Sequence, residues 1–298
     1  MTAMQDEFGA YPDAFHARRE VRSFVKPPVQ GFFLDKMYRL SPLSRDTREL
    51  LYKSAAEFTN WWLTYRTSDD GLPRYHHGNE SGWDNGTVFK DGLPAKSPDL
   101  STWLILQMDF LAREAEVLEL PEDQARWRYI SQQLQSALLN LLLTDNGFQA
   151  IRVTGSDSWP VQSESLILFL PLLLGDDIPE LIRNSLLDKL LADGKYFTPY
   201  GFASEPLDSK QFAEDGYWRG AVWPPTALLL SELLIRCGRS EEALRNAQAY
   251  CDMCVDSGFF ENYSAIDGHG LRDCGFTWSA SVFMIFIRDY LERGSGSD

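Results

Sequence analysis

The stretch SRDTRELLYKSAAEFTNWWLTY, residues 44–65, sets the pattern from which we predict the fold. Its apolar residues recur every three or four positions, as Leu50, Phe58 and Trp62 show, and this spacing buries one face of an α-helix. Residues 66–98, which follow, have no sustained period. We therefore predict a long helix that leads into a long loop.

This alternation of helix and loop continues along the chain. Further helices are predicted from apolar periodicity, from caps at Asp99 and Ser240, and from Pro121 at a first helical turn. The predicted helices cover residues 29–40, 99–120, 121–143, 162–174, 179–192, 222–237, 240–255 and 277–291. Strand patterns are scarce, although residues 148–153 could pair locally. We therefore predict an all-α chain with about ten helices.

Three long loops, at residues 66–98, 193–220 and 256–276, occupy equivalent places in this alternation. Loops of such length in a compact domain are usually functional. Each of them carries aromatic side chains and at least one acid. In a ring of helical hairpins the three loops would gather at one end, and we predict that they form a single site.

Composition excludes several classes of partner. The formal net charge of −15 argues against binding to nucleic acid or to anionic membranes, because both need a positive surface. No apolar run is long enough to span a membrane, and the chain does not open with a secretory pattern. We therefore expect an enzyme of the cytoplasm.

The four cysteines include a C-x-x-C pair, Cys251 and Cys254, inside a predicted helix. A redox or zinc role would need a βαβ context or a second pair of ligands, and the sequence has neither. We predict that these thiols are structural. His76 and His77 are adjacent, so on an extended loop they face opposite ways, and we predict no metal site.

The first loop contains NESGWDNG, residues 79–86, with two carboxylates beside an indole. Gly, Asn, Asp and Ser are common turn residues, so a surface turn explains this composition. A carboxyl group beside an aromatic wall is also what cleavage of a glycosidic bond requires. Both interpretations fit this stretch alone.

Four segments together resemble the (α/α)6-barrel glycosidases, especially glycoside hydrolase family 63. They are ESGWDNG, YWRGAVWPP, ENY and GFTWSAS, and they occur in the family's order. Lys26-Pro27-Pro28 and the helix after it also resemble a family segment, so the likeness extends from about residue 26 to residue 290. The resemblance implies a single (α/α)6 toroid-type domain over residues 1–298 that hydrolyses α-glycosides with inversion.

The resemblance also implies roles for individual residues. Asp84 would be the general acid and Glu261 the general base that activates water. This agrees with the need for two carboxyl groups on opposite sides of one bond. The implied substrate-binding residues are Glu80, Trp83, Asn85, Tyr217, Trp218, Arg219, Trp223, Tyr263 and Trp278.

Several of these residues also have structural explanations. Glu80 could brace its loop instead of binding a hydroxyl group, and Arg219 could form an ion pair with an acid of the same rim. Trp278, at a helix start, is the aromatic residue that best fits the core. The three alternatives therefore stay open at this point.

The substrate is predicted as a small carbohydrate: an α-glucoside, an α-mannoside or a glycosylglycerate. No cofactor is implied. A trehalase-like hydrolase is one alternative, although YWRGAVWPP differs from the corresponding trehalase segment. The other alternative is a non-catalytic carbohydrate-binding or regulatory protein. Ala227 follows WPPT where relatives often carry Asn, which leaves the sugar preference open.

A complete ring of six hairpins has twelve helices, more than we count. We therefore predict that one or two opening helices are missing and that self-association or another chain covers the exposed flank.

Overall fold

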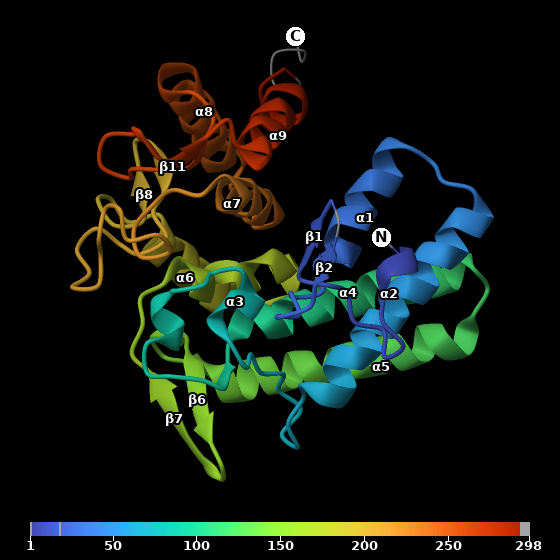
Figure 1. Ribbon diagram of the computed structural model, residues 1–298. Helices are drawn as coiled ribbons and strands as arrows, with labels where there is room; N and C mark the ends of the chain where they lie inside the picture. The colour runs from blue at the N-terminus through green and yellow to red at the C-terminus, as the bar shows by residue number, and fades with distance from the viewer. Residues whose placement is uncertain (1, 18, 293–298) are drawn as a thin grey trace. The chain divides into compact units, whose positions relative to one another are not determined.

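The computed structural model describes residues 2–17 and 19–292 and divides into two compact units (Figure 1). The first unit consists of Met1–Asp84 and Asp91–Gln162, and the second of Asn85–Lys90 and Ser163–Asp298. Each unit is described separately below. The prediction of a single domain stays a prediction.

The first unit is built around helix α4, Pro98–Val117. Helices α1 (Gln30–Leu40), α2 (Arg45–Tyr65) and α5 (Pro121–Ala137) pack against it, and α4 and α5 run side by side in Figure 1. Because α4 has neighbours on several sides, even its polar residue Gln107 is fully buried.

The start of α4 differs from the prediction by two residues. Ser97 is the N-cap and Pro98 occupies the first turn, so Asp99 lies inside the helix and is not its cap. The Asp99 carboxylate is buried and accepts hydrogen bonds from the hydroxyl groups of Ser97 and of Tyr75, the latter at 2.7 Å. Burial raises the pKa of Asp99 to about 6, although these hydrogen bonds oppose the change.

The strands of the first unit are short. β1 (Ala14–His16) pairs with β2 (Arg19–Val21), and β4 (Leu143–Thr144) pairs with β5 (Gly147–Phe148), each antiparallel. The order β3-β6-β7 forms a three-stranded antiparallel sheet from Ala95–Lys96, Ala150–Thr154 and Asp157–Val161. Local strand pairing near residues 148–153 is therefore confirmed.

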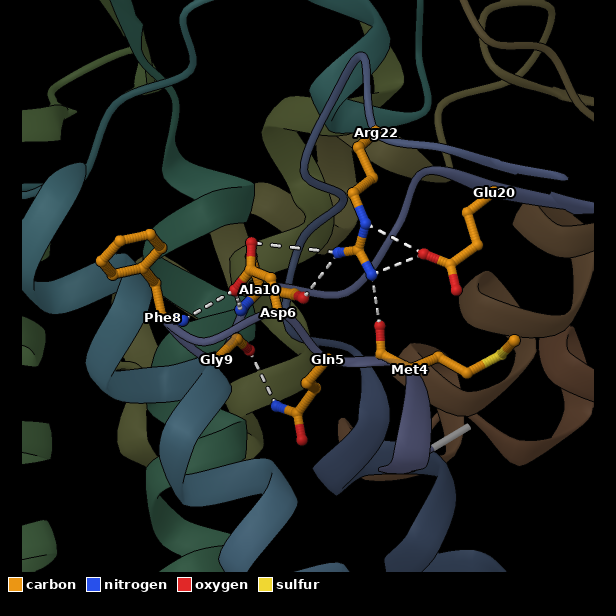
Figure 2. Close-up of polar contacts among 8 residues, drawn as sticks. All are labelled: Met4, Gln5, Asp6, Phe8, Gly9, Ala10, Glu20 and Arg22. Atoms are coloured by element: carbon orange, nitrogen blue, oxygen red, sulfur yellow. Dashed lines mark hydrogen bonds and ion pairs between the residues drawn. The ribbon is translucent and has the colours of Figure 1, made fainter.

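Arg22 holds the N-terminal segment of this unit together (Figure 2). Its guanidinium donates to the carbonyl oxygen of Met4 at 2.7 Å and to the Glu20 carboxylate at 2.6 Å, and it lies 3.9 Å from Asp6. Gln5 donates to the carbonyl oxygens of Gly9 and of Ser54 in α2. These contacts fasten the segment to α2.

The second unit contains helices α6 (Glu180–Leu190), α7 (Pro224–Arg236), α8 (Ser240–Ser257) and α9 (Thr277–Phe286). Helix α7 packs against α8, α9 and the segment Leu166–Asp177. Two hairpins complete the unit: β8 (Phe197–Thr198) with β9 (Gly201–Phe202), and β10 (Phe260–Tyr263) with β11 (Gly270–Cys274). Short helical segments also occur at Thr87–Phe89 and Ile287–Leu291.

The apolar run predicted as a helix at residues 162–174 is buried, as expected, but it is not an α-helix. It forms 3-10 turns over Leu166–Asp177 with Pro171 inside and a kink at Gly175, where φ is +60°. Pro171 has no N–H to donate and Gly175 leaves the helical region, so a regular α-helix cannot form.

The other predicted helices are present, with bounds that differ by a few residues. Within the described residues there are nine α-helices, one of them a single turn, which is fewer than the twelve of a complete ring. Cys251 and Cys254 are free thiols buried in α8, so they lie in the core, while their structural role stays a prediction. Among the described residues, no helix has both the length and the apolar character needed to cross a bilayer.

Candidate active site

The loop that carries Asp84 begins with a single helical turn, α3, Gly78–Ser81. His77 and Glu80 form a reciprocal capping box, in which each side chain accepts a backbone N–H of the turn. The Glu80 carboxylate accepts from the N–H of His76 at 2.5 Å and pairs with Arg66 at 2.7 Å. Its burial, with 3% exposed, therefore supports the bracing interpretation of Glu80.

The Lys-Pro-Pro segment also contacts this loop. Lys26 donates from Nζ to the carbonyl oxygen of Asn79 and lies 3.2 Å from the carboxylate of Asp13. The Phe24 ring stacks on the His77 ring at a centroid distance of 4.5 Å. These contacts, and the pair of Glu80 with Arg66, could not be predicted from the sequence because no periodic pattern links such distant positions.

Asp84 follows the turn directly. Gly82 ends α3 with φ +78°, a backbone conformation that glycine adopts without strain. The hydroxyl of Ser81 then accepts from the N–H of Trp83 at 2.9 Å. Trp83 is nearly buried and Asp84 is half-buried. Within the described part of the chain the Asp84 carboxyl group has no hydrogen-bond or ion-pair partner, so it is available for proton transfer.

Asn85, the next residue, belongs to the second unit and is held by both ends of its amide. Nδ2 donates to the carbonyl oxygen of Gly216 at 3.0 Å, and Oδ1 accepts from the N–H of Trp218 at 2.9 Å. Substrate binding by Asn85 stays a prediction, but this geometry favours a structural role. It fixes the segment that follows Asp84 to the loop that carries Tyr217 and Trp218.

A buried carboxyl group fixes the same segment further along. Glu205 is fully buried and accepts from the hydroxyl groups of Thr87 at 2.8 Å and Ser209 at 2.9 Å. Burial raises the pKa of Glu205, and these two hydrogen bonds partly offset the effect. Residues 85–90 are therefore tied to the rest of the second unit through the side chains of Asn85 and Thr87.

Three predicted tryptophans and Tyr217 form one aromatic cluster in the second unit. The rings of Trp218 and Trp223 stack at 3.9 Å with an interplanar angle of 5°. Tyr217 meets the Trp223 ring edge-on at 4.7 Å, and Trp278 lies 5.9 Å from it. Trp223 is 1% exposed whereas Trp278 is only partly buried, so the expectation that Trp278 best fits the core is wrong. The indole N–H of Trp223 donates to the carbonyl oxygen of Tyr217 at 3.1 Å, which orders the loop.

Glu261 lies on β10 beside this cluster. The Tyr217 hydroxyl donates to Oε1 of Glu261 at 3.2 Å, and the indole N–H of Trp278 donates to the backbone oxygen of Glu261 at 3.0 Å. Glu261 is partly exposed, and no partner for its Oε2 is found among the described residues. One carboxylate oxygen is therefore held while the other is free to accept a proton.

Arg219 and Tyr263 have contrasting surroundings. No ion pair involves Arg219 in the part of the chain that the structure describes, and its Nε is buried without a partner. The Tyr263 side chain is completely buried, and its hydroxyl donates to the Gly258 oxygen and accepts from the Phe260 N–H. Arg219 is thus available for a ligand, whereas the geometry of Tyr263 favours a core role.

One group of potential metal ligands occurs among the described residues. Donor atoms of Glu214, Asp267 and His269 lie within 4.8 Å of one another. All three side chains are substantially exposed, and His269 Nδ1 already lies 2.5 Å from the Asp267 carboxylate. His76, by contrast, directs Nδ1 to Arg66 at 2.9 Å.

The predicted residues therefore fall into two groups. The first unit contains Glu80, Trp83 and Asp84. The second unit contains Asn85, Tyr217, Trp218, Arg219, Trp223, Glu261, Tyr263 and Trp278. Within the second unit, the structure brings the base candidate Glu261 together with the aromatic cluster.

Comparison with solved structures shows the fold. The crystal structure of a GH63 mannosylglycerate hydrolase from Thermus thermophilus, in complex with Tris and D-glycerate, aligns with a TM-score of 0.84 at 19% identity. The alignment covers 96% of this chain and 86% of that one. The chain therefore has the (α/α)6-barrel fold predicted from its sequence.

Sequence relatives agree with this result. Mannosyl-oligosaccharide glucosidase of Saccharomyces cerevisiae is 26% identical over 300 residues, which cover 80% of this chain and 35% of that protein. Mannosylglycerate hydrolase MGH1 of Selaginella moellendorffii is 32% identical over 88 residues, which cover 30% of this chain and 18% of that protein. The chain thus spans about a third or less of these relatives.

A family model described as the mannosylglycerate hydrolase MGH1-like glycoside hydrolase domain matches residues 1–279. Because this match extends over most of the chain, the protein belongs to the family of MGH1-like glycoside hydrolase domains.

Proposed function

We propose that this protein hydrolyses an α-glycosidic bond of a small glycoside with inversion at the anomeric carbon. The observation that carries the proposal is the setting of Glu261, whose Oε1 accepts the Tyr217 hydroxyl while Oε2 has no partner within the described residues. A general base needs this combination, because it must be fixed in orientation and still accept a proton from water.

In the proposed reaction, Asp84 donates its proton to the glycosidic oxygen as the bond to the anomeric carbon breaks. Glu261 removes a proton from a water molecule, whose oxygen attacks that carbon from the opposite face. The absence of a partner for Asp84 among the described residues fits a group that must bind and release a proton. Exchange with solvent then returns both carboxyl groups to their starting states.

The proposed substrates are α-glucosides, α-mannosides and glycosylglycerates. Aromatic faces stack on the apolar faces of sugar rings, and Tyr217 and Trp278, the partly exposed members of the cluster, would offer such surfaces. Trp218 and Trp223 are buried against each other and pack behind them. Arg219, which has no ion pair within the described residues, would bind sugar hydroxyls or the carboxylate of a glycerate group. Relatives named as mannosylglycerate hydrolase and as mannosyl-oligosaccharide glucosidase support this range.

Location in the cytoplasm and self-association are further parts of this proposal. They rest on the sequence patterns alone, and size-exclusion chromatography with light scattering would test self-association.

The activity is tested by a proton NMR screen of α-glucosides, α-mannosides, mannosylglycerate and trehalose. Asp84→Asn should abolish cleavage of substrates with poor leaving groups and retain more activity on activated ones, which need no protonation. Glu261→Gln should depress both, because both need attack by water. Binding of these sugars without cleavage would instead support a non-catalytic carbohydrate-binding protein, and preferential cleavage of trehalose a trehalase-like enzyme.

A further inference from the structure

Two residues of the second unit have backbone conformations that side chains disfavour. Tyr217 has φ +64° and Arg272 has φ +66°. Neither is a glycine, and such conformations persist only where the surrounding structure imposes them, which is common at functional sites. Both residues lie close to Glu261 in the hydrogen-bonded structure described next.

Arg272 occupies a β-bulge opposite Glu261. In the β10–β11 pairing, Phe260 lies opposite Cys274 and Asn262 lies opposite Leu271. Two residues of β11, Arg272 and Asp273, therefore face the single residue Glu261 of β10. Because a bulge bends the strand and redirects its side chains, the strained conformation of Arg272 determines where its guanidinium points.

The guanidinium of Arg272 crosses to the loop that carries Tyr217. Its Nη2 lies 2.7 Å from Oδ1 of Asp215 and donates to the backbone oxygen of the same residue at 3.0 Å. Its Cζ lies 5.8 Å from the centroid of the Tyr217 ring. Tyr217 in turn donates its hydroxyl to Oε1 of Glu261 at 3.2 Å. Arg272 is thus linked to Glu261 in two ways: across the β10–β11 hairpin, and through Asp215 and Tyr217 of the neighbouring loop.

We propose that Arg272 is a positioning residue that acts on Glu261 through Tyr217. It holds Asp215 and the Tyr217 ring so that the tyrosine hydroxyl fixes one carboxylate oxygen of Glu261. The proposal rests on the proposed role of Glu261 as the general base. Neither the role of Arg272 nor the bulge could be predicted from the sequence, because a single arginine in a polar loop has no distinguishing pattern.

The competing explanation is an ordinary surface ion pair. The side chains of Arg272 and Asp215 are 40% and 56% exposed, and pairs this exposed contribute little to stability. Arg239, whose side chain is 43% exposed, pairs with Glu242 at 3.1 Å in the same unit. Arg239→Ala is therefore a matched control for the loss of an exposed arginine.

Three variants distinguish a displacement of Glu261 from a loss of fold stability: Arg272→Ala, Arg272→Gly and Tyr217→Phe. Arg272→Ala should lower kcat by about 10- to 100-fold, with KM changed less than threefold, because a displaced catalytic group slows the reaction. Arg272→Gly should lower kcat equally, yet melt about 2 °C higher than Arg272→Ala because glycine tolerates the positive φ. Arg239→Ala should leave kcat unchanged.

A double-mutant cycle tests whether Arg272 acts through Tyr217. Tyr217→Phe removes the hydroxyl that Glu261 accepts, so both this variant and Arg272→Ala should move the acidic limb of the kcat/KM profile to higher pH. In the double variant, the added loss from Arg272→Ala should be less than twofold. Full additivity, or a kcat for Arg272→Ala equal to that of wild type, would overturn the proposal.

One measurement keeps this inference separate from the proposed function. The carbon-13 chemical shift of the Glu261 carboxyl carbon, assigned with the Glu261→Gln spectrum, reports the hydrogen bond from Tyr217 and needs no activity. At neutral pH it should change in Tyr217→Phe and in Arg272→Ala, and by no more in the double variant than in Tyr217→Phe. An unchanged chemical shift in Arg272→Ala overturns the inference, whereas a wild type that cleaves nothing overturns the proposed function alone.

Discussion

Replacing Asp99 with asparagine should stabilise the protein at neutral pH and do so much less at acidic pH. The Asp99 carboxyl is buried at the start of α4, where burial raises its pKa from 3.8 to about 6. Keeping it ionised in the fold therefore opposes folding at neutral pH. Asparagine retains a side-chain oxygen that can accept from Tyr75 and carries no charge.

The sign and size of the effect follow from proton linkage. The folded chain holds the Asp99 proton more tightly than the unfolded chain, so the wild type loses stability as pH rises from about 4 to about 6. A pKa change from 3.8 to about 6 corresponds to about 3 kcal/mol at pH 7. At pH 4.5 about 1 kcal/mol of this penalty remains. The advantage of Asp99→Asn should thus grow by about 2 kcal/mol between pH 4.5 and pH 7.

Urea denaturation followed by tryptophan fluorescence at several pH values measures this difference. Asp69→Asn is the control, because Asp69 is an exposed aspartate of the same unit. The quantity of interest is the difference in unfolding free energy between variant and wild type at each pH. A difference that stays constant from pH 4.5 to pH 7 would refute the reasoning about Asp99.

Three further predictions concern other parts of the chain. Glu80→Ala should destabilise the fold by about 3–5 kcal/mol in urea denaturation, because it leaves the partly buried Arg66 without its partner; an unchanged midpoint would argue against bracing. Arg219→Ala should weaken sugar binding in calorimetry without lowering Tm, and a parallel fall in Tm would indicate a structural role. At pH 8, iodoacetamide should label the exposed Cys274 and spare Cys251, whose thiol pKa burial raises to about 12, as intact mass would reveal.

The helices were predictable because their signals are local. In residues 45–65, for example, apolar spacing and the Ser44 cap lie within the segment that they organise. The α-helix predicted at residues 162–174 was wrong because a continuous apolar stretch indicates burial but not the type of helix. Pro171 and Gly175 prevent a regular α-helix there, and the segment forms 3-10 turns.

The surroundings of the candidate site residues were less predictable. Motifs picked out Glu261, but its contact with Tyr217 depends on a loop and a hairpin that are distant in the sequence. The positive φ of Arg272 leaves no sequence signal, because the residues that usually mark this conformation are glycine, asparagine and aspartate. The roles of such residues emerge only from three-dimensional contacts.

The stereochemistry of the released sugar tests the central claim most directly. A proton NMR time course begun immediately after mixing enzyme with an α-linked substrate distinguishes the anomers before mutarotation. Direct attack by water activated by Glu261 predicts that the β-anomer appears first. Initial release of the α-anomer would contradict the inverting mechanism and the role proposed for Glu261.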